Sequence, residues 1–450
     1  MAYVIVAAVG VLWWGMSDPG GLWAQEQYSE PTLTLRTALE LADRHSPLLS
    51  SERSLTQAAR AGAIAAKDSL FPRLQVTGGY LRDDAQEKLL IRRTRLDGLS
   101  ADEKFNSEIY DFQVILNYPI FAPKISHQAD AEAALANAVS SKELVTRDRL
   151  YIAVVKVYYR ILLLSRSILA VEASIEGLQE TRRIIERNVD LGRLPPIALL
   201  RIKTRLSKVE LDLLNLTNDQ KQQWLILEAL VGTDLHQNTE LIEELTLQSV
   251  DFDQESSVQF ALENRPDIQA LQYSLERAMA SERVIGSTYI PVVNLTLNRS
   301  RYWGNNAPDP VDDLFVGVRF TVPLYDPTYS PKKSKAAANV AATRYRLSQL
   351  NNNVQAEVLG AFLDMEKAQQ ATKVTEYAFQ LAKEAFRLEQ KRFEIGHSTI
   401  NDVLQAQADL LSAELGNASA LLKLKFAVAR LFQVRGDVSI DNLAPLGGVQ

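Results

Sequence analysis

Hydrophobic residues along this chain of 450 residues recur with two different periods. After Pro123, and again after Pro331, roughly 65 residues run without proline and with little glycine before a break. At 1.5 Å per residue, such a helix would be about 100 Å long, far beyond the usual 11–12 residues. In the first of these stretches the apolar positions alternate in steps of three and four, which is typical of a coiled-coil seam: Val154, Val157, Ile161, Leu164, Ile168, Val171, Ile175 and Leu178.

Each long helical stretch ends at a glycine and is followed by a second, shorter one. The segment "VDLGRLPPIALL" (189–200) contains Gly192 and two prolines, and "FEIGHSTI" contains Gly396. Glycine ends helices in a left-handed conformation, whereas proline is tolerated in the first turn of a new helix. The shorter helices are predicted over 196–231 and 399–432. The pattern therefore predicts two antiparallel helical hairpins.

Between Pro72 and Pro119, and between Pro291 and Pro323, the period changes to two. Four segments of about 10 residues each alternate apolar and polar side chains, as tilted transmembrane strands do. A soluble sheet with one buried face would alternate in the same way. The membrane interpretation is favoured because the long helices leave no free face to cover two isolated strand hairpins. Four aromatic residues near the strand ends are expected to form a membrane girdle: Tyr110, Tyr118, Tyr302 and Trp303.

The two halves of the chain repeat one pattern. Pro47 and Pro266, like Pro72 and Pro291, are separated by 219 residues. Further along, Pro119 and Pro323, like Gly192 and Gly396, are separated by 204 residues, so the first copy has a longer loop between its strands. We interpret this as a duplicated unit.

The duplication divides the chain into five parts. A signal peptide is expected over 1–24, because residues 2–16 are apolar and uncharged and small residues precede Ala24. A buried apolar segment or a misassigned start codon would also account for it. The first repeat is predicted over 25–232, a linker over 233–256, the second repeat over 257–435 and a tail over 436–450.

The composition excludes several classes of function. A net charge of −6 does not favour a nucleic-acid partner, and the absence of cysteine excludes disulfides, thiolate metal sites and a cysteine nucleophile. The four histidines lack metal-ligand spacing, and no phosphate-binding loop, H-E-x-x-H motif or Ser/His/Asp pattern occurs. We therefore expect no enzyme, no cofactor and no metal site.

The sequence resembles the TolC-type outer-membrane efflux family in four features taken together. These are the repeat, the strand hairpins after Pro72 and Pro291, the "YPIF" and "VPLY" segments and the paired glycine turns. The resemblance implies a mainly α fold with a β-barrel part, in which three copies share one outer-membrane barrel of a Gram-negative bacterium. Their helices would continue it as a periplasmic tunnel. The trimer would be a passive exit duct for efflux or type I secretion, together with a periplasmic adaptor and an inner-membrane pump. The alternative is a soluble periplasmic coiled-coil adaptor or scaffold.

The resemblance also assigns roles near the turns. Asp402, six residues past Gly396, matches a pore-entrance aspartate of the family, and Gln405 occupies the second such position. Asp402 could equally cap a helix that begins after Thr399. Arg193 could bind an adaptor carboxylate or remain an idle solvated charge. Ala198, Phe393 and Ser398 replace residues that brace the closed entrance in the family's best-known member. The adaptor is expected to dock on the two turns: Gly192, Arg193, Leu194, Gly396, His397 and Ser398.

Overall fold

The structure is a computed structural model that describes residues 32–82, 108–235, 240–242, 252–304 and 310–446. The predicted signal peptide (1–24), the longer first-copy loop (within 83–107), part of the predicted linker and the last four residues lie outside the described residues. Within the described part of the chain, no helix is both long enough and apolar enough to cross a bilayer.

The elements of the first half reappear in the same order in the second half, as the sequence repeat predicts. Outside the two copies lie a short parallel strand pair, β1 (Thr32–Leu33) with β4 (Glu240–Leu241), and two short C-terminal helices, α10 (Ile440–Leu443) and η2 (Ala444–Leu446). The first copy comprises α1 (Leu35–His45), α2 (Pro47–Asp68), β2 (Arg73–Arg82), β3 (Glu108–Phe121), α4 (Pro123–Asp190) and α5 (Ile197–Val231). The second comprises α6 (Gln254–Asn264), α7 (Pro266–Gly286), η1 (Ser287–Tyr289), β5 (Val292–Gly304), β6 (Val311–Thr321), α8 (Tyr329–Glu394) and α9 (Ile400–Arg435).

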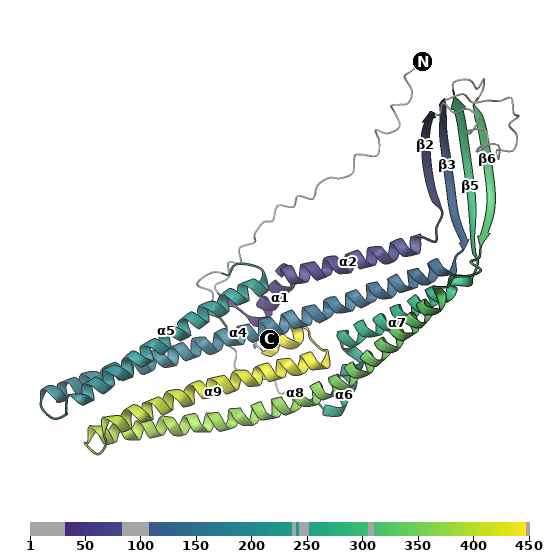
Figure 1. Ribbon diagram of the computed structural model, residues 1–450. Helices are drawn as coiled ribbons and strands as arrows, with labels where there is room; N and C mark the ends of the chain where they lie inside the picture. The colour runs from purple at the N-terminus through teal and green to yellow at the C-terminus, as the bar shows by residue number, and fades with distance from the viewer. Residues whose placement is uncertain (1–31, 83–107, 236–239, 243–251, 305–309, 447–450) are drawn as a thin grey trace.

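The two long helices dominate the molecule. Helix α4 has 68 residues and α8 has 66, which confirms the length read from the sequence. Helix α4 begins at Pro123, where a missing N–H is harmless because the first turn has no acceptor for it. Each long helix pairs with its shorter successor, α5 or α9, into a hairpin. Both hairpin tips lie at one end of the molecule, and the strands lie at the other (Figure 1).

The four long strands form one antiparallel sheet in the order β2-β3-β5-β6. Strands β3 and β5 belong to different copies, so their pairing joins the two halves of the chain. Side chains alternate between the two faces of each strand. Face A is the mainly apolar face. At the end nearest the helices, a bulge between Pro119 and Phe121 shifts the register by one residue, so Phe121 pairs with Val293 and also lies on face A. Its members include Leu74, Val76, Tyr80, Tyr110, Phe112, Val114, Leu116, Tyr118, Leu295, Leu297, Trp303, Leu314, Val316, Val318 and Phe320.

The main hydrophobic core lies in the middle of the molecule, where α1 and the ends of α5 and α9 surround α4. The predicted seam of α4 is largely confirmed, because Val154, Ile161 and Leu178 are buried. Two other seam residues, Ile168 and Ile175, are only half-buried. The core also contains polar contacts.

Tyr158 is the main polar anchor of this core. Its ring is fully buried, and its hydroxyl lies 3.0 Å from the carbonyl oxygen of Leu33 and 2.8 Å from that of Ile242. Leu33 belongs to β1, and Ile242 directly follows β4. The hydroxyl therefore ties the small β1–β4 pair to the middle of α4.

Both shorter helices end at a glycine that packs on the short helices of its own copy. Gly232 follows α5 with φ 79°, and Gly436 follows α9 with φ 76°. A Cβ on Gly232 would lie 2.4 Å from the carbonyl oxygen of His45, at the α1–α2 junction. A Cβ on Gly436 would lie 2.9 Å from the Cα of Arg265, at the α6–α7 junction. The duplication therefore repeats this packing contact as well as the secondary structure.

Arg265 fastens that second junction. Its guanidinium is bound to both carboxylate oxygens of Asp267, at 3.0 and 2.7 Å, and to Glu357 of α8 at 2.7 Å. It also donates to the carbonyl oxygen of Val434 in α9, 3.2 Å away. Burial would lower its pKa, but the two carboxylates outweigh this and raise it. Arg265 therefore stays charged and links α7, α8 and α9.

Candidate functional site

The two hairpin tips have the same backbone geometry. At the first tip the amide of Gly192 donates to Val189 (2.9 Å) and that of Arg193 donates to Asn188 (2.8 Å). At the second tip Gly396 donates to Phe393 (3.0 Å) and His397 donates to Arg392 (2.8 Å). These paired bonds form a Schellman motif, which needs a left-handed residue at its centre. The two glycines have φ of 70° and 79°, as the sequence predicts, and a Cβ on either would meet nothing within 4 Å.

The first tip is apolar on the side that faces the second hairpin. Leu194 is half-buried and Ala198 is only 3% exposed, both within a cluster that also contains Ile400 and Val403 of α9. Pro196 is the N-cap of α5, so both prolines lie just before the helix. Arg193 is exposed. Ala198 therefore joins the two hairpins through the hydrophobic core of one chain rather than through a polar contact.

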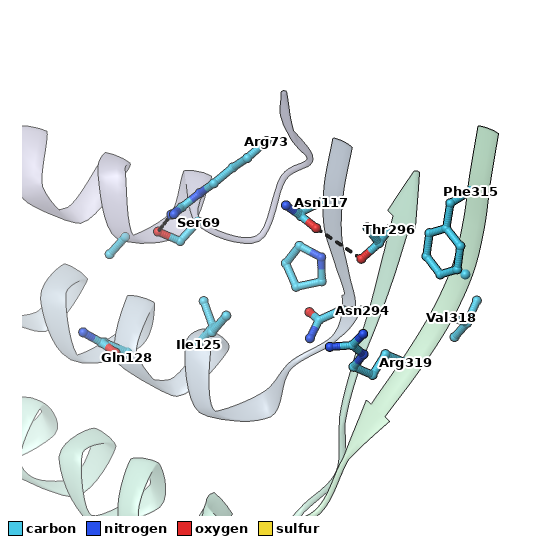
Figure 2. A pocket seen from close by; sticks show the side chains of 13 residues that line it. Ser69, Arg73, Asn117, Ile125, Gln128, Asn294, Thr296, Phe315, Val318 and Arg319 are labelled. Atoms are coloured by element: carbon cyan, nitrogen blue, oxygen red, sulfur yellow. Dashed lines mark hydrogen bonds between the residues drawn. The ribbon is translucent and has the colours of Figure 1, made fainter. Parts of the chain in front are cut away.

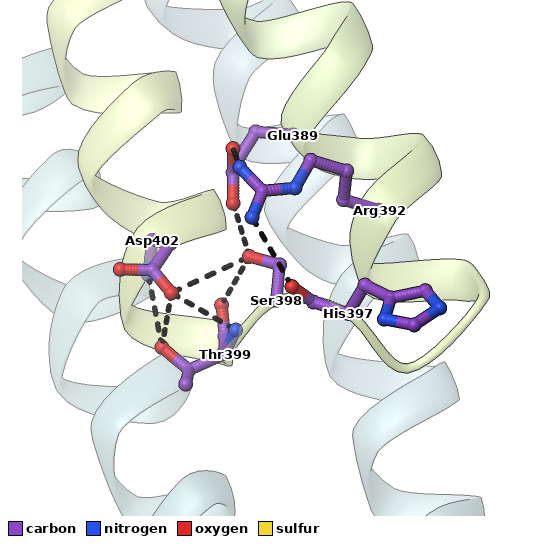
Figure 3. A network of polar contacts seen from close by, with 6 residues as sticks. All are labelled: Glu389, Arg392, His397, Ser398, Thr399 and Asp402. Carbon is purple, nitrogen blue, oxygen red and sulfur yellow. Dashed lines mark hydrogen bonds and ion pairs between the residues drawn. The ribbon is translucent and has the colours of Figure 1, made fainter.

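At the second tip Thr399 and Asp402 form a capping box. The amide of Thr399 donates to the Asp402 carboxylate at 2.9 Å, its hydroxyl lies 2.7 Å from the same oxygen, and the amide of Asp402 contacts the Thr399 hydroxyl at 3.4 Å (Figure 3). The hydrogen bonds from Thr399 lower the pKa of Asp402. The capping role predicted for Asp402 is confirmed, and the exposed carboxylate remains charged at neutral pH.

The same network extends back to the long helix α8. The Ser398 hydroxyl donates to the carboxylate of Glu389, which also pairs with Arg392 at 3.3 Å (Figure 3). Arg392 donates to the carbonyl oxygen of His397 at 3.3 Å, whereas the His397 ring points away from this network (Figure 3). Ser398 therefore closes the turn by internal bonds, and the imidazole of His397 lies outside them.

A line of polar residues continues up α9 from the tip. Asp402, Gln405 and Asp409 follow in steps of three and four, so they share one face of the helix. The Gln405 amide donates to Asp409 at 2.9 Å. Sequence reasoning did not single out Asp409, although its spacing from Asp402 was visible.

A buried glutamine, which no pattern in the sequence singles out, also connects the hairpins. Gln407 of α9 is 7% exposed, and its amide nitrogen donates to the backbone oxygen of Ser174 in α4 at 3.1 Å. Helix α4 has room for the glutamine at this point because Gly177 has no side chain; a Cβ added to it would lie 3.4 Å from that nitrogen. Together with the apolar cluster at Ala198, this bond holds the two tips of one chain side by side.

At the far end of the sheet, three aromatic rings lie together on face A. The Tyr80 and Tyr110 rings are 5.0 Å apart, and Tyr110 stacks on Trp303 at 5.9 Å. Tyr118 lies on the same face near the helical end. Tyr302 differs from the expected girdle, because it is the direct neighbour of Trp303 and points to the opposite face, where it is 8% exposed.

The opposite face, face B, is mainly polar and lines a pocket above the start of the helices. Asn117, Asn294, Thr296 and Arg319 all contribute to it, and Thr296 donates to Asn117 at 3.1 Å (Figure 2). Among the described residues, no group of three or more His, Asp or Glu side chains is placed to hold a metal ion. The sheet therefore presents an exposed apolar side and a polar side that lines a half-open pocket where it meets the helices.

A family comparison decides which proteins share this architecture. The model for the outer membrane efflux protein family matches residues 38–233 and 258–437, most of the chain. The chain belongs to the outer membrane efflux protein family. It is a protein of the outer membrane, with its helices in the periplasm, and its relatives are efflux and secretion channels.

Individual relatives of this efflux-family chain are distant but cover nearly all of it. It is 23% identical over 425 residues to the outer membrane protein TolC of Vibrio cholerae, spanning 89% of this chain and 90% of TolC. It is 22% identical over 412 residues to the pyoverdine export outer membrane protein OpmQ of Pseudomonas putida, spanning 88% and 84%. The solved structure of the CmeC outer membrane channel of Campylobacter jejuni matches with a TM-score of 0.80 at 16% identity, spanning 90% and 85%.

Proposed function

We propose that three copies of this chain form an exit duct through the outer membrane, as part of a tripartite efflux or type I secretion system. The observation that carries the proposal is the open four-stranded sheet with an exposed apolar face. Four strands cannot close a barrel, and an open edge is not tolerated in lipid. Closure therefore requires strands from further copies, and face A suits lipid while face B suits a water-filled lumen.

The helical part supports assembly in the same way. Helix α8 buries few side chains within the chain, and its exposed apolar residues recur at coiled-coil spacing. An apolar surface of this kind marks an interface. A second such surface lies on α5, at the other edge of the helical layer (Figure 1). The exposed residues are Leu359, Leu363, Val374, Tyr377, Leu381 and Leu388 on α8, and Leu200, Leu211, Leu214 and Leu225 on α5.

The hairpin tips are the proposed docking end. In this assignment a periplasmic adaptor, itself bound to an inner-membrane pump, contacts the exposed residues of the two turns. These are Gly192, Arg193 and Leu194 on the first turn and Gly396, His397 and Ser398 on the second. Asp402 and Gln405 line the entrance, with Asp409 one turn further in. The alternative of a soluble adaptor or scaffold finds no support in the family match.

The assembly is tested by purifying the full chain in detergent and measuring its mass by light scattering, then its conductance in planar bilayers. We expect a trimer that conducts without any added energy source. The matched variants are Leu363→Lys on the exposed α8 surface and Lys367→Leu one turn away. The first should weaken the trimer, whereas the second should not. A monomer recovered from the soluble periplasmic fraction would refute the proposal.

The entrance is tested by channel block. Asp402→Ala should lower block by multivalent cations in single-channel recordings, because three carboxylates would be lost from the proposed entrance of the trimer. Asp402 also caps α9, so Thr399→Ala is the matched control: it weakens the cap and keeps the carboxylate. Block that is unchanged in Asp402→Ala, or lost equally in Thr399→Ala, would remove Asp402 from the pore lining.

A further inference from the structure

Strand β5 carries two arginines on face A, at positions where apolar side chains are expected. Along β5 the residues on this face are apolar from Val293 to Leu297, and the next two positions are Arg299 and Arg301. Both guanidinium side chains are 55% exposed. Their neighbours across the sheet on β3 are Val114 and Phe112. The two cations therefore project from the same exposed surface as the predicted lipid-facing residues.

Among the described residues, a single carboxylate forms an ion pair with these two arginines. Asp312 of β6 lies 3.7 Å from Arg299 and 4.0 Å from Arg301, and its side chain is 43% exposed. Both distances exceed those of a hydrogen bond. One negative charge thus stands between two positive charges, and within the described part of the chain the donors of both guanidinium groups are left available for a second anion.

The cost of arginine in lipid places these residues at a membrane boundary. An arginine on the lipid face of a barrel costs about 2–4 kcal/mol at the bilayer midplane and about 0–1 kcal/mol near the interface. From Asp312 to Phe320 the strand rises about 26 Å, or about 20 Å in height at a tilt near 40°. Leu324 and Tyr325, which are 92% and 82% exposed, extend the apolar surface beyond the strand. The band between the arginines and these residues is about as tall as the apolar band of outer-membrane proteins.

The aromatic trio lies just beyond the arginines on the side away from the helices. Trp303 is two residues past Arg301 on the same face, and it stacks with Tyr110. Aromatic side chains concentrate at the level of lipid headgroups. The helices lie in the periplasm, so this end of the sheet is the outer one. The arginine pair is therefore at the headgroup level of the outer leaflet.

We propose that Arg299 and Arg301 bind the phosphate of a lipid headgroup in the outer leaflet, a proposal that rests on the membrane-spanning role proposed for the sheet. Guanidinium groups bind phosphate oxygens through paired hydrogen bonds. Two of them separated by one strand position can chelate a single phosphate, which would compete with Asp312 for their positive charge. Phe112 and Leu314 beside them would contact the acyl chains.

The test measures binding of diphosphoryl lipid A to the purified full chain in detergent by native mass spectrometry. The double variant Arg299→Gln/Arg301→Gln should bind at least tenfold more weakly. The matched control is Arg319→Gln, which removes an arginine from the polar face of the same sheet and should bind as the wild type does. Lipid A stripped of its phosphates should bind the wild type as weakly as diphosphoryl lipid A binds the double variant. Excess inorganic phosphate should compete only weakly, because it lacks acyl chains.

Asp312→Asn supplies a gain that a misfolded variant could not produce. Removing the competing carboxylate should tighten binding of diphosphoryl lipid A several-fold. Equal binding by the wild type and the double variant, equal binding of the phosphate-free lipid, or no gain in Asp312→Asn would each overturn the proposal. Conductance of the wild type is recorded separately. A conducting trimer without phosphate-dependent lipid binding refutes this site alone, whereas a wild type that never conducts refutes the proposed duct.

Discussion

Four glycines with positive φ offer a comparison in which the backbone strain is constant and the packing differs. Gly192 and Gly396 lie at the hairpin tips, and Gly232 and Gly436 end the shorter helices, all with φ between 70° and 79°. An alanine in the left-handed region costs about 1–2 kcal/mol at any of the four. At the tips that is the whole cost, because an added Cβ meets nothing within 4 Å.

The cost at the helix ends is larger because the added Cβ meets backbone. In Gly232→Ala it would lie 2.4 Å from the His45 oxygen, and in Gly436→Ala 2.8 Å from Arg265 Cγ and 2.9 Å from its Cα. Overpacking of this kind costs about 1–3 kcal/mol more. We therefore expect about 1–2 kcal/mol for the tip variants and about 2–5 kcal/mol for the other two, with Gly232→Ala the more severe.

Hydrogen exchange of backbone amides, followed by mass spectrometry, can resolve these local effects. Since about 1.4 kcal/mol corresponds to a factor of ten, Gly192→Ala should speed exchange at Arg193 and Leu194 by about 5- to 30-fold. It should leave the end of α5 unchanged. Gly232→Ala should speed exchange by more than about 30-fold at the end of α5 and at the α1–α2 junction. Equal effects in the two variants would refute the reasoning that separates strain from packing.

Three further perturbations test single contacts. Arg265→Met should lower the stability of the end of α9 by about 2 kcal/mol, which hydrogen exchange at 431–437 can measure. This is below the usual cost of breaking a buried ion pair, because the two carboxylate partners of Arg265 can be hydrated again. The pKa of Asp402 is lower in the folded chain than in the unfolded one, so its cap is complete above the unfolded pKa of 3.8 and is lost as the pH falls below that value. Pepsin should then cleave the second tip faster. A Thr399→Ala variant should lack this acid-induced step. Tyr158→Phe removes the hydroxyl from two carbonyl oxygens, one buried and one half-buried, and should cost about 1–3 kcal/mol in thermal unfolding. The exposed Tyr377→Phe should cost almost nothing.

The periodic features of the sequence predicted most of the fold. The helices are confirmed because a seam such as that from Val154 to Leu178 has only one regular structure that buries it. The turns at Gly192 and Gly396 are confirmed because left-handed backbone at a helix end favours glycine. The capping box at Thr399 followed from local spacing alone. These features depend on neighbours within a few residues, which a sequence displays directly.

Contacts between distant segments could not be read in the same way. The bond from Gln407 to Ser174 joins residues 233 positions apart, and it depends on how α9 lies against α4. The burial of Ala198 between the hairpins depends on the same placement. Tyr302 is a different case. It precedes Trp303 directly, so strand alternation already excluded a shared face, and the expected girdle was wrong for this residue.

The edge strands β2 and β6 have a consequence for the life of the newly exported chain. Each offers one row of backbone donors and acceptors to whatever extended segment reaches it, beside the exposed apolar surface of face A. A folded monomer is therefore a template for strand addition, and another copy competes for its edges with any unfolded polypeptide nearby. Assembly must be faster than those encounters, so the yield of channel should depend on the supply of chains and on chaperones that cover the two edges in transit.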